Sequence, residues 1–468
     1  MQENIAPPSN SASSGTGNPL KVRIAALNVL NALGQSDHTL DTVLDRFRQQ
    51  HPFALQRDRA LLQNIVFGVL RWRAHLDFII GSFSRTPLKK IKPEILNVLR
   101  IGTFQVVYLD RIPASAAVNT SVELAKALAP NWVVRFVNAV LRKVATGHKE
   151  IQYPSVAKAP VAALAVSKSL PPWLIHRWMK RFELDETVRL CDALNTIPPI
   201  TLRANTLKTD RRRLLHLLIE QGESVQAATN TPDGVILYHP RQPFTEMETH
   251  QSGLFQVQDE AAQLVSLLLN PQNGERVLDA CAGRGGKTAH MAQLMNNKGA
   301  VIAVDVSADK LKTLSIEMIR LGITIVKTRD TNLLESLPGN GLGVFDRILI
   351  DAPCSGLGVL RRNPDAKWTV SKKMFGRYNR RQTALLDSVV PLVKPNGVLV
   401  YAVCSNEPEE GKAVIEYFLE RHKDFRKDAP VSISPGVDIP LFSHDGILNT
   451  YPHRHNMDGF FAARFRRI

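Results

Sequence analysis

Hydrophobic positions in the first third of the chain recur at three- and four-residue steps, which is the spacing of one helix face. Such stripes run through residues 24–30, 61–70, 95–109 and 136–141. Prolines at positions 52, 87, 93, 113 and 130 separate the stripes. The pattern predicts an all-α domain of about five to seven helices over residues 21–148.

The middle of the chain mixes helical periodicity with the alternation that is typical of strands. A Pro-, Ala- and Lys-rich stretch at 153–163 is typical of a linker. Beyond it, the pattern predicts helices at 172–182, 184–194 and 211–221, with short strands at 201–205 and 234–238. We therefore expect a small α+β module over residues 165–256, which links its neighbours or binds RNA.

From residue 257 to 468 short apolar runs alternate with helical stripes. Strands are predicted at 276–280, 301–305, 324–327, 347–351 and 398–403. Helices are predicted at 260–269, 286–296, 308–321, 378–393 and 409–422. This alternation predicts a Rossmann-like, doubly wound α/β domain with a parallel sheet. The alternating segment 458–465 predicts an added antiparallel edge strand.

Charge adds a candidate partner. The 468 residues carry 59 Lys and Arg against 43 Asp and Glu, a formal charge of +16. Such an excess suits a polyanion such as nucleic acid. Charge alone leaves the alternative of a basic protein with no such partner equally open.

The remaining composition narrows the class of protein. Residues 1–20, rich in Ser, Asn, Gly and Pro, predict a disordered tail without the apolar segment of a signal peptide. The sequence contains no apolar run of about 18 residues, so we expect no membrane-spanning helix. Four widely spaced cysteines form neither a disulfide framework nor a zinc pattern, so we expect no metal and a cytoplasmic location.

A glycine-rich loop follows the first predicted strand of the α/β domain. The loop Asp279–Thr288 contains three glycines, which allow a tight turn and close approach to a ligand. It lacks the spacing of a phosphate-binding P-loop. Asp305, Asp330 and Asp351 lie at or just beyond the ends of later strands. This acidic edge predicts a cofactor crevice that suits an adenosine carrying a sulfonium cation better than a pyrophosphate.

Two cysteines occupy equivalent places in the pattern. Cys354 and Cys404 each come just after an apolar run, at 347–351 and 398–402. Each is expected at the carboxyl end of a buried strand, where open α/β sheets bind ligands. Paired thiols beside a cofactor crevice favour nucleophilic chemistry. Cys191, inside an apolar helix, is interpreted as a small core residue.

The helical region resembles a known family. Segments 59–62, 67–71, 111–118 and 136–142 are similar to the NusB family of RNA-binding helical domains, over roughly residues 20–146. The resemblance implies RNA contact by this domain. The alternative is a helical bundle that serves only for docking.

Four ordered segments of the α/β region resemble motifs of the S-adenosylmethionine-dependent RNA cytosine-C5 methyltransferases. They are Asp279–Thr288, Asp351–Gly358, Arg361–Trp368 and Cys404–Glu410, within a match over 256–466. With the NusB-like region in front, the whole chain resembles the bacterial 16S rRNA enzymes of this family. The strand-end pattern and the resemblance together assign S-adenosylmethionine contacts to Cys281, Ala282, Gly283, Arg284, Gly285, Gly286, Lys287, Asp305, Asp330 and Asp351.

The resemblance also implies a mechanism. C5 of cytosine is a poor nucleophile, and addition of a thiolate at C6 activates it. The family pattern makes Cys404 the nucleophile, with Cys354 assisting proton removal and product release. Asp351 would hydrogen-bond the base, and Lys287 is a candidate for orienting the group. Cys404 precedes a predicted helix, and helix N-termini stabilise anions.

Two positions depart from the family pattern. Gly283-Arg284 replaces Ala-Pro, and Val403 replaces Thr. Loss of the proline frees the loop and weakens the case for tight cofactor binding. Neither change removes a group with a required chemical role.

The expected substrate is 16S rRNA, free or in an assembling small subunit, bound by a monomer. Candidate RNA contacts are Arg203, Arg361, Arg362, Lys367, Arg380 and Arg381. Trp368 is either a stacking partner for a base or a core residue. The alternatives are the same chemistry on tRNA or 23S rRNA, and an RNA-binding assembly factor whose methyltransferase domain is vestigial.

Overall fold

The computed structural model describes residues 19–35, 39–51, 53, 55–335, 341–429, 441–443 and 445–468. The predicted disordered tail lies outside them, apart from Pro19 and Leu20, which begin the first helix. The chain divides into two compact units. The first comprises residues up to 195 together with 363–369, and the second comprises 196–362 and 370–468.

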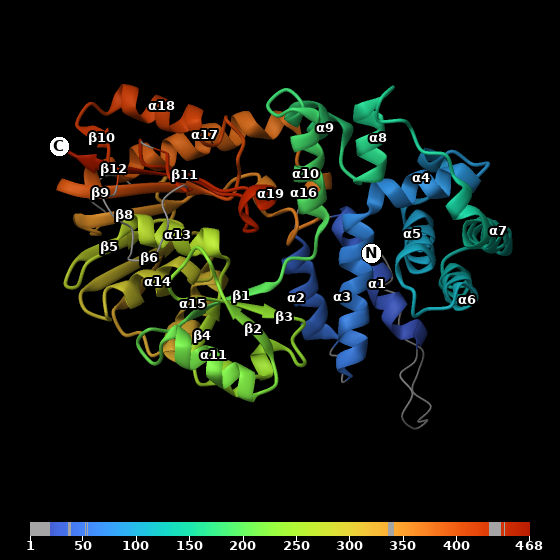
Figure 1. The fold of residues 1–468 in the computed structure, drawn as a ribbon, viewed down its shortest axis with the longest axis horizontal. Helices are drawn as coiled ribbons and strands as arrows, with labels where there is room; N and C mark the ends of the chain where they lie inside the picture. Colours follow the sequence, from blue (N-terminus) through green and yellow to red (C-terminus); the bar gives the residue numbers. More distant parts are fainter. Residues whose placement is uncertain are drawn as a thin grey trace. The chain divides into compact units, whose positions relative to one another are not determined.

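The described residues of the first unit form helices joined by connecting segments, without a strand among them. The unit is longer than the predicted all-α domain, because it also includes a helix at 160–167, which overlaps the predicted linker, and the part of the predicted α+β module up to residue 195. Seven helices over residues 19–147 correspond to the NusB-like region (Figure 1): α1 (Pro19–Gln35), α2 (Leu40–Gln50), α3 (Gln56–Arg71), α4 (Arg73–Phe83), α5 (Pro93–Tyr108), α6 (Ala114–Lys126) and α7 (Asn131–Gly147). Their apolar stripes share one buried core, which includes Leu27, Ile65, Val98 and Leu141. The same unit continues with α8 (Pro160–Ser167), α9 (Pro172–Trp178) and α10 (Leu184–Asn195).

A short segment from much later in the sequence completes this helical unit. Residues 363–369, which include α16 (Ala366–Thr369), pack with the helices. The Trp368 indole N–H donates to the carbonyl oxygen of Leu70 at 2.7 Å, and Trp368 contacts the helical core. The Asp365 carboxylate accepts from the backbone N–H of Leu40 at the start of α2, at 3.1 Å. Trp368 is therefore a packing residue here, one of its two predicted roles.

The second unit begins with a small antiparallel sheet. Its strands are β1 (Ile200–Ala204), β2 (Ser224–Ala227), β3 (Gly234–Tyr238) and β4 (Phe255–Val257), in the order β2-β3-β1-β4. The helices α11 (Arg211–Glu220) and α12 (Glu248–Gln251) accompany it. Leu214 and Leu218 of α11 join the core beneath the sheet, with Leu202, Val235 and Phe255.

The large sheet has the predicted Rossmann-like topology. Its parallel strands are β5 (Arg276–Asp279), β6 (Ala300–Asp305), β7 (Val326–Asp330), β8 (Phe345–Asp351) and β9 (Val393–Val403). Three antiparallel strands extend it: β10 (Phe425–Lys427), β11 (Ile447–Asn449) and β12 (Phe461–Arg467). The path is β10-β12-β9-β8-β5-β6-β7, with β11 beside β12. Pairing of β12 with β9 confirms the added antiparallel strand.

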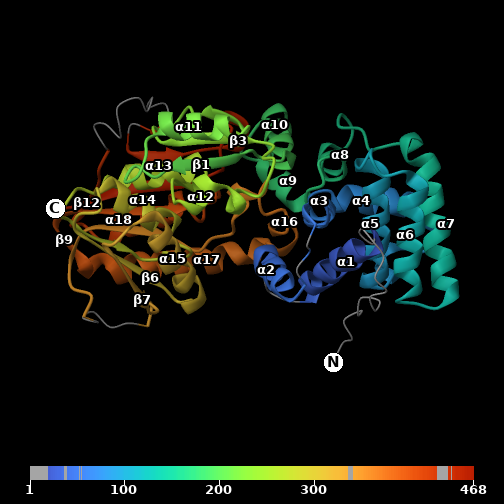
Figure 2. The ribbon, with the colours of Figure 1, turned by 90° about the horizontal axis from the view of Figure 1, so that it is seen from below.

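Helices cover both faces of this sheet because successive side chains of each strand point to opposite sides. Val277, Ala303 and Leu349 belong to one core, which they share with α13 (Glu260–Leu269), α14 (Gly286–Leu294) and α15 (Ala308–Leu321). Leu278, Ile302 and Ile350 belong to the other core, with α17 (Lys372–Val389) and α18 (Lys412–Arg421). Figures 1 and 2 show the two helical layers. A short helix, α19 (Pro452–His455), precedes β12.

Parallel strands bring the predicted site residues to one edge. Asp279, Asp305, Asp330 and Asp351 are the last residues of β5, β6, β7 and β8, and Cys404 follows β9 directly. Asp305 and Asp330 are direct partners in register. Among the described helices, none is long and apolar enough to cross a membrane.

Candidate active site

The glycine loop opens between β5 and α14. Gly283 and Gly285 have φ values of +55° and +87°, in the left-handed region that favours glycine. A Cβ atom on Gly285 would lie 2.5 Å from Cγ of Leu314, so a side chain there would displace α15. A Cβ on Gly283 would meet no atom within 4 Å. The loop therefore combines close packing behind it with open space in front of Gly283.

Asp305 joins this loop to the next strand. One carboxylate oxygen accepts from the backbone N–H of Gly283 at 2.9 Å, and the other accepts from the N–H of Ser307 at 2.9 Å. Each carboxylate oxygen keeps a further lone pair. Asp330 is exposed beside it. Open space at the loop, flanked by carboxylates, fits the adenosine and cationic sulfonium of S-adenosylmethionine.

The start of the loop holds a buried acid. Asp279 accepts from the Thr288 hydroxyl at 2.7 Å through one oxygen. Burial, countered in part by that hydrogen bond, raises the pKa of Asp279 to about 7. Burial and the charges of Asp279, Asp351 and Asp305 raise the pKa of Cys281, so this thiol keeps its proton. Cys281 is half-buried and Ala282 is buried, whereas Arg284 is exposed and Gly286 begins α14.

Lys287 and Asp351 form the charged centre of the site. The Lys287 ammonium lies 2.6 Å from the Asp351 carboxylate and 5.1 Å from the ring centroid of Phe460. Burial alone would lower the pKa of Lys287, but the charges of Asp351 and Cys404 and the hydrogen bond to Asp351 outweigh it and raise the pKa. Lys287 is therefore a cation in the working pH range. Its charge also interacts favourably with a negative charge on Cys404.

The two cysteines meet at the ends of β8 and β9. Their Sγ atoms are 3.3 Å apart, within hydrogen-bonding distance for sulfur, and both side chains are half-buried. The hydrogen bond with Cys404, burial, and the charges of Cys404 and Glu410 raise the pKa of Cys354 well above its ordinary value. Either sulfur can donate this hydrogen bond while both are thiols, and Cys354 is the donor once Cys404 is a thiolate.

Main-chain contacts fix the position of Cys404. Gly358, the last residue of the Asp351–Gly358 motif, donates its N–H to the Cys404 carbonyl oxygen at 3.0 Å and accepts from the N–H of Gly459 at 2.8 Å. A Cβ on Gly358 would lie 1.9 Å from the Gly459 carbonyl oxygen. The motif requires glycine here because three backbone segments meet at this point.

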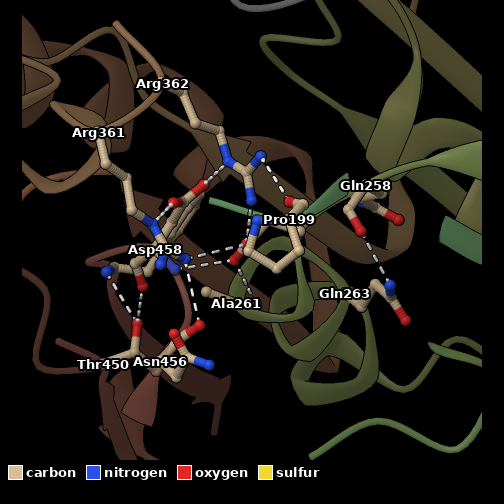
Figure 3. Close-up of polar contacts among 11 residues, drawn as sticks. Pro199, Gln258, Ala261, Gln263, Arg361, Arg362, Thr450, Asn456 and Asp458 are labelled. Atoms are coloured by element: carbon tan, nitrogen blue, oxygen red, sulfur yellow. Dashed lines mark hydrogen bonds and ion pairs between the residues drawn. The ribbon is translucent and has the colours of Figure 1, made fainter. Parts of the chain in front are cut away.

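Burial of Arg361 contradicts its predicted RNA contact, while Arg362 is half-buried and belongs to the same ion-pair network. Arg361 is buried and donates to Asp458 at 2.8 Å, and Arg362 binds Asp458 and Asp259 at 2.7 Å each. Figure 3 shows both guanidinium groups directed at the Asp458 carboxylate. Two arginines shared by two buried aspartates form a structural ion-pair network, which positions the segment after Cys354.

Two further predicted RNA contacts are also buried. Arg203 has no exposed surface and donates to Gln256 and Gln293 at 2.9 Å each, and also to Gln258. Lys367 is buried within the helical unit, 2.6 Å from the Asn195 side-chain oxygen. A side chain enclosed in this way cannot reach a phosphate, so direct RNA contact by Arg203 and Lys367 is contradicted. Arg380 and Arg381, in α17, are exposed.

The helix after Cys404 starts later than predicted. The chain turns at Pro408–Gly411, and α18 begins at Lys412. The reason is that Glu410 directs its side chain into the site, where it accepts from Ser355 and Ser405. The helix thus begins eight residues after Cys404, and not five residues after it as predicted. Sequence reasoning missed Glu410, although it ends the Cys404–Glu410 motif.

Comparisons with known proteins agree with this architecture. The family described as 16S rRNA methyltransferase RsmB/F matches residues 266–466, the NusB family matches 20–146, and an RsmF/B-like ferredoxin-like domain matches 170–243. The probable ribosomal RNA small subunit methyltransferase B of Synechocystis sp. is 35% identical over 96% of this chain and 100% of its own length. The corresponding Bacillus subtilis protein is 35% identical over 95% of this chain and 98% of its own length.

Solved structures share the fold. The crystal structure of PH0851 is 26% identical, covers 97% of this chain and 100% of its own, and has a TM-score of 0.80. A methyltransferase homolog from Pyrococcus horikoshii is 27% identical and covers 67% of this chain and 100% of its own, with a TM-score of 0.57. Fold and site together define an S-adenosylmethionine-dependent methyltransferase. The chain belongs to the ribosomal RNA small subunit methyltransferase B family.

Proposed function

We propose that this protein methylates C5 of a cytosine in 16S rRNA through a covalent bond between Cys404 and C6 of the base. The observation that carries the proposal is the pair of sulfur atoms 3.3 Å apart at the cofactor end of the sheet. The names of the full-length relatives support a small-subunit rRNA substrate. We further expect a monomer that acts in the cytoplasm on free rRNA or on an assembling subunit.

The nucleophilic step follows from the charges around Cys404. Its thiolate, stabilised by the nearby Lys287 ammonium, adds to C6, and the electron pair released makes C5 nucleophilic. S-adenosylmethionine, when bound, supplies an electrophilic methyl group, which C5 takes. We propose that Asp351, half-exposed beside Lys287, accepts a hydrogen bond from the base as charge develops on its ring.

Cys354 is suited to the second half of the reaction. While Cys404 is a thiolate, its hydrogen bond and negative charge help to hold the proton on Cys354. Bonding of Cys404 to C6 removes that charge, so Cys354 can lose its proton to solvent and act as a base. It then takes the proton from C5 and returns it to the Cys404 sulfur as the bond to C6 breaks. The short distance between the sulfurs permits this transfer.

The target base must leave its stack to reach the site. The exposed Arg380 and Arg381 lie on α17, the helix whose Gln382 donates to the Pro353 carbonyl beside Cys354. We propose these two arginines as contacts for RNA phosphates near the target. The residues proposed to hold the cofactor are Cys281, Ala282, Gly283, Arg284, Gly285, Gly286, Lys287, Asp305, Asp330 and Asp351.

Paired cysteine variants test the proposal. Cys404→Ala should abolish methyl transfer to unmodified 16S rRNA because no covalent bond to C6 can form. Cys354→Ala should form the bond but break it slowly, so an RNA–protein species resistant to SDS should accumulate. Cys191→Ala is the control, because Cys191 is buried in the helical unit. Full activity of Cys404→Ala, or absence of the adduct in Cys354→Ala, contradicts the proposal.

A further inference from the structure

Glu410 is a buried carboxylate that belongs to neither of the proposed catalytic steps. Its side chain has no exposed surface. Four donors from three segments converge on it: the Ser355 N–H at 2.7 Å, the Ser355 hydroxyl at 2.5 Å, the Ser405 hydroxyl at 2.6 Å and the Gln382 side-chain amide at 3.3 Å. Among the ion pairs of the described residues, none includes Glu410, so its side-chain partners are neutral hydrogen-bond donors.

The donors come from the residues next to the two cysteines. Ser355 directly follows Cys354, and Ser405 directly follows Cys404. The Glu410 carboxylate thus links the two cysteine-bearing segments, which are 50 residues apart in the sequence. Gln382 adds a third link, because its amide donates both to Glu410 and to the Pro353 carbonyl oxygen.

Glu410 is itself held in place. Its carbonyl oxygen accepts from the buried Tyr401 hydroxyl at 2.6 Å, and its N–H donates to the Glu407 carbonyl at 3.0 Å. Tyr401 lies in β9, three residues before Cys404. Hydrogen bonds to a charged group are about twice as strong as neutral ones, and a buried network of this kind restricts its members to one arrangement.

We infer that Glu410 is a positioning residue that clamps the Cys354 and Cys404 segments together and so sets the distance between the two thiols. This inference rests on the proposed covalent mechanism for its catalytic consequence, but the clamp itself is a property of the free protein. The carboxylate also places a negative charge near Cys354. That charge favours the protonated form of Cys354 and disfavours a second thiolate beside Cys404.

Glu410→Gln tests the clamp because it retains the size of the side chain and removes its charge. The first measurement is the rate at which iodoacetamide alkylates each cysteine in the free protein, followed by peptide mass spectrometry. Alkylation of Cys354 should become at least about fivefold faster relative to Cys404, because thiolates are the reactive form. Across a pH series, the midpoint of Cys354 alkylation should move to lower pH. A merely structural role would not produce this selective shift.

The second measurement is single-turnover methyl transfer. Glu410→Gln should lower its rate at least about tenfold, with the dissociation constant of S-adenosylmethionine within about twofold of wild type, because small displacements of reacting groups cost large factors in rate. The control is Glu420→Gln, whose side chain is exposed on α18, and it should match wild type in both measurements. If wild type transfers no methyl group, the proposed function fails while alkylation still tests the clamp.

An unchanged alkylation ratio in a folded Glu410→Gln protein overturns the inference, whatever the methylation result. If Glu410→Gln does not fold, Ser405→Ala replaces it, because this variant removes one donor and leaves the carboxylate. It should loosen the clamp less, with Cys354 alkylation about twofold faster relative to Cys404 than in wild type. A Ser405→Ala ratio equal to that of wild type then overturns the inference.

Discussion

Lys287 and Asp351 face each other across 2.6 Å, one from the start of α14 and the other from the end of β8. The pair joins the cofactor loop to the segment that carries Cys354. Because the Lys287 charge also interacts with Cys404, a single ammonium group connects cofactor site, base site and nucleophile.

Lys287→Met should lower the rate of methyl transfer by about 100-fold, a loss typical for removal of a preorganised charge from a site. The pKa of Lys287 is raised above its ordinary value, so in wild type the cation is present throughout the assay range. Without it a negative charge on Cys404 loses a favourable partner, so the pH–rate profile should move toward higher pH. Single-turnover rates from pH 6 to 10 measure this shift.

Lys298→Met is the matched control, since Lys298 is an exposed lysine in the segment that follows α14. Its profile should coincide with that of wild type. An unshifted profile for Lys287→Met would show that the ammonium does not stabilise the nucleophile.

Gly358→Ala should disrupt the site by a steric contact. The added methyl group meets the Gly459 carbonyl oxygen at 1.9 Å and the Cys404 carbonyl oxygen at 3.0 Å. Overpacking of this kind costs about 1–3 kcal/mol, so we expect a lower Tm and loss of activity. Gly376→Ala, on α17 with no neighbour closer than 4.0 Å, should instead keep or slightly raise the Tm. Thermal melts and methylation assays of both variants decide the matter; equal behaviour would contradict the packing argument.

Arg361→Ala should destabilise the second unit without a specific effect on RNA. Removing one partner of a buried ion pair costs about 3–5 kcal/mol, because Asp458 and Asp259 lose a partner. RNA affinity of the protein that remains folded, and its salt dependence, should stay as in wild type. Differential scanning calorimetry and filter binding provide the two readouts.

A double variant of the exposed arginines, Arg380→Gln with Arg381→Gln, should weaken RNA binding and leave the stability of the protein unchanged. Together they should weaken rRNA binding and reduce the slope of log K against log salt by about one to two, as expected for one or two lost phosphate contacts. The free energy of unfolding should change by no more than about 0.5 kcal/mol, so the Tm should stay close to that of wild type. An unchanged salt slope would remove both residues from the RNA interface.

Lys367 predicts a pH dependence of stability in the helical unit. Burial, together with the charge of Arg71, lowers its pKa from 10.5 to about 7. Between these two pH values the unfolded chain binds more protons than the folded one, so the contribution of Lys367 to stability rises with pH. Lys367→Met removes this contribution, and the Tm of wild type relative to the variant should therefore increase from pH 7 to pH 10.

Thermal melts of both proteins at pH 6, 8 and 10 test this dependence. Each kcal/mol corresponds to about 2–4 °C in a unit of this size. The exposed Lys149→Met serves as the control and should give a difference that does not vary with pH. A similarly flat difference for Lys367→Met would contradict a lowered pKa.

Much of the fold follows from sequence periodicity. The apolar runs before Asp351 and before Cys404 predict β8 and β9, because strands buried on both faces consist of continuous apolar residues. The parallel order then brings Asp305, Asp351 and Cys404 to one edge. Periodicity could not find the start of α18, since the side chain of Glu410 turns inward to bind Ser355 and Ser405.

Burial of charged side chains was the main feature that the sequence could not predict. Arg361 and Lys367 follow the cysteine motif in a basic stretch, and exposed phosphate contacts were the natural expectation. Their partners, Asp458 and Asn195, are 97 and 172 residues away in the chain. Only the tertiary structure shows that these groups meet inside the protein, whereas Arg380 and Arg381 remain outside.

The most direct test of the account is methyl transfer from labelled S-adenosylmethionine to unmodified 16S rRNA, tRNA and 23S rRNA, with sequencing of the modified position. The account predicts label at C5 of a cytosine in 16S rRNA for wild type and none for Cys404→Ala. Label at another atom of the base, or equal label with Cys404→Ala, would contradict the covalent mechanism. Label only in tRNA or 23S rRNA would contradict the proposed substrate.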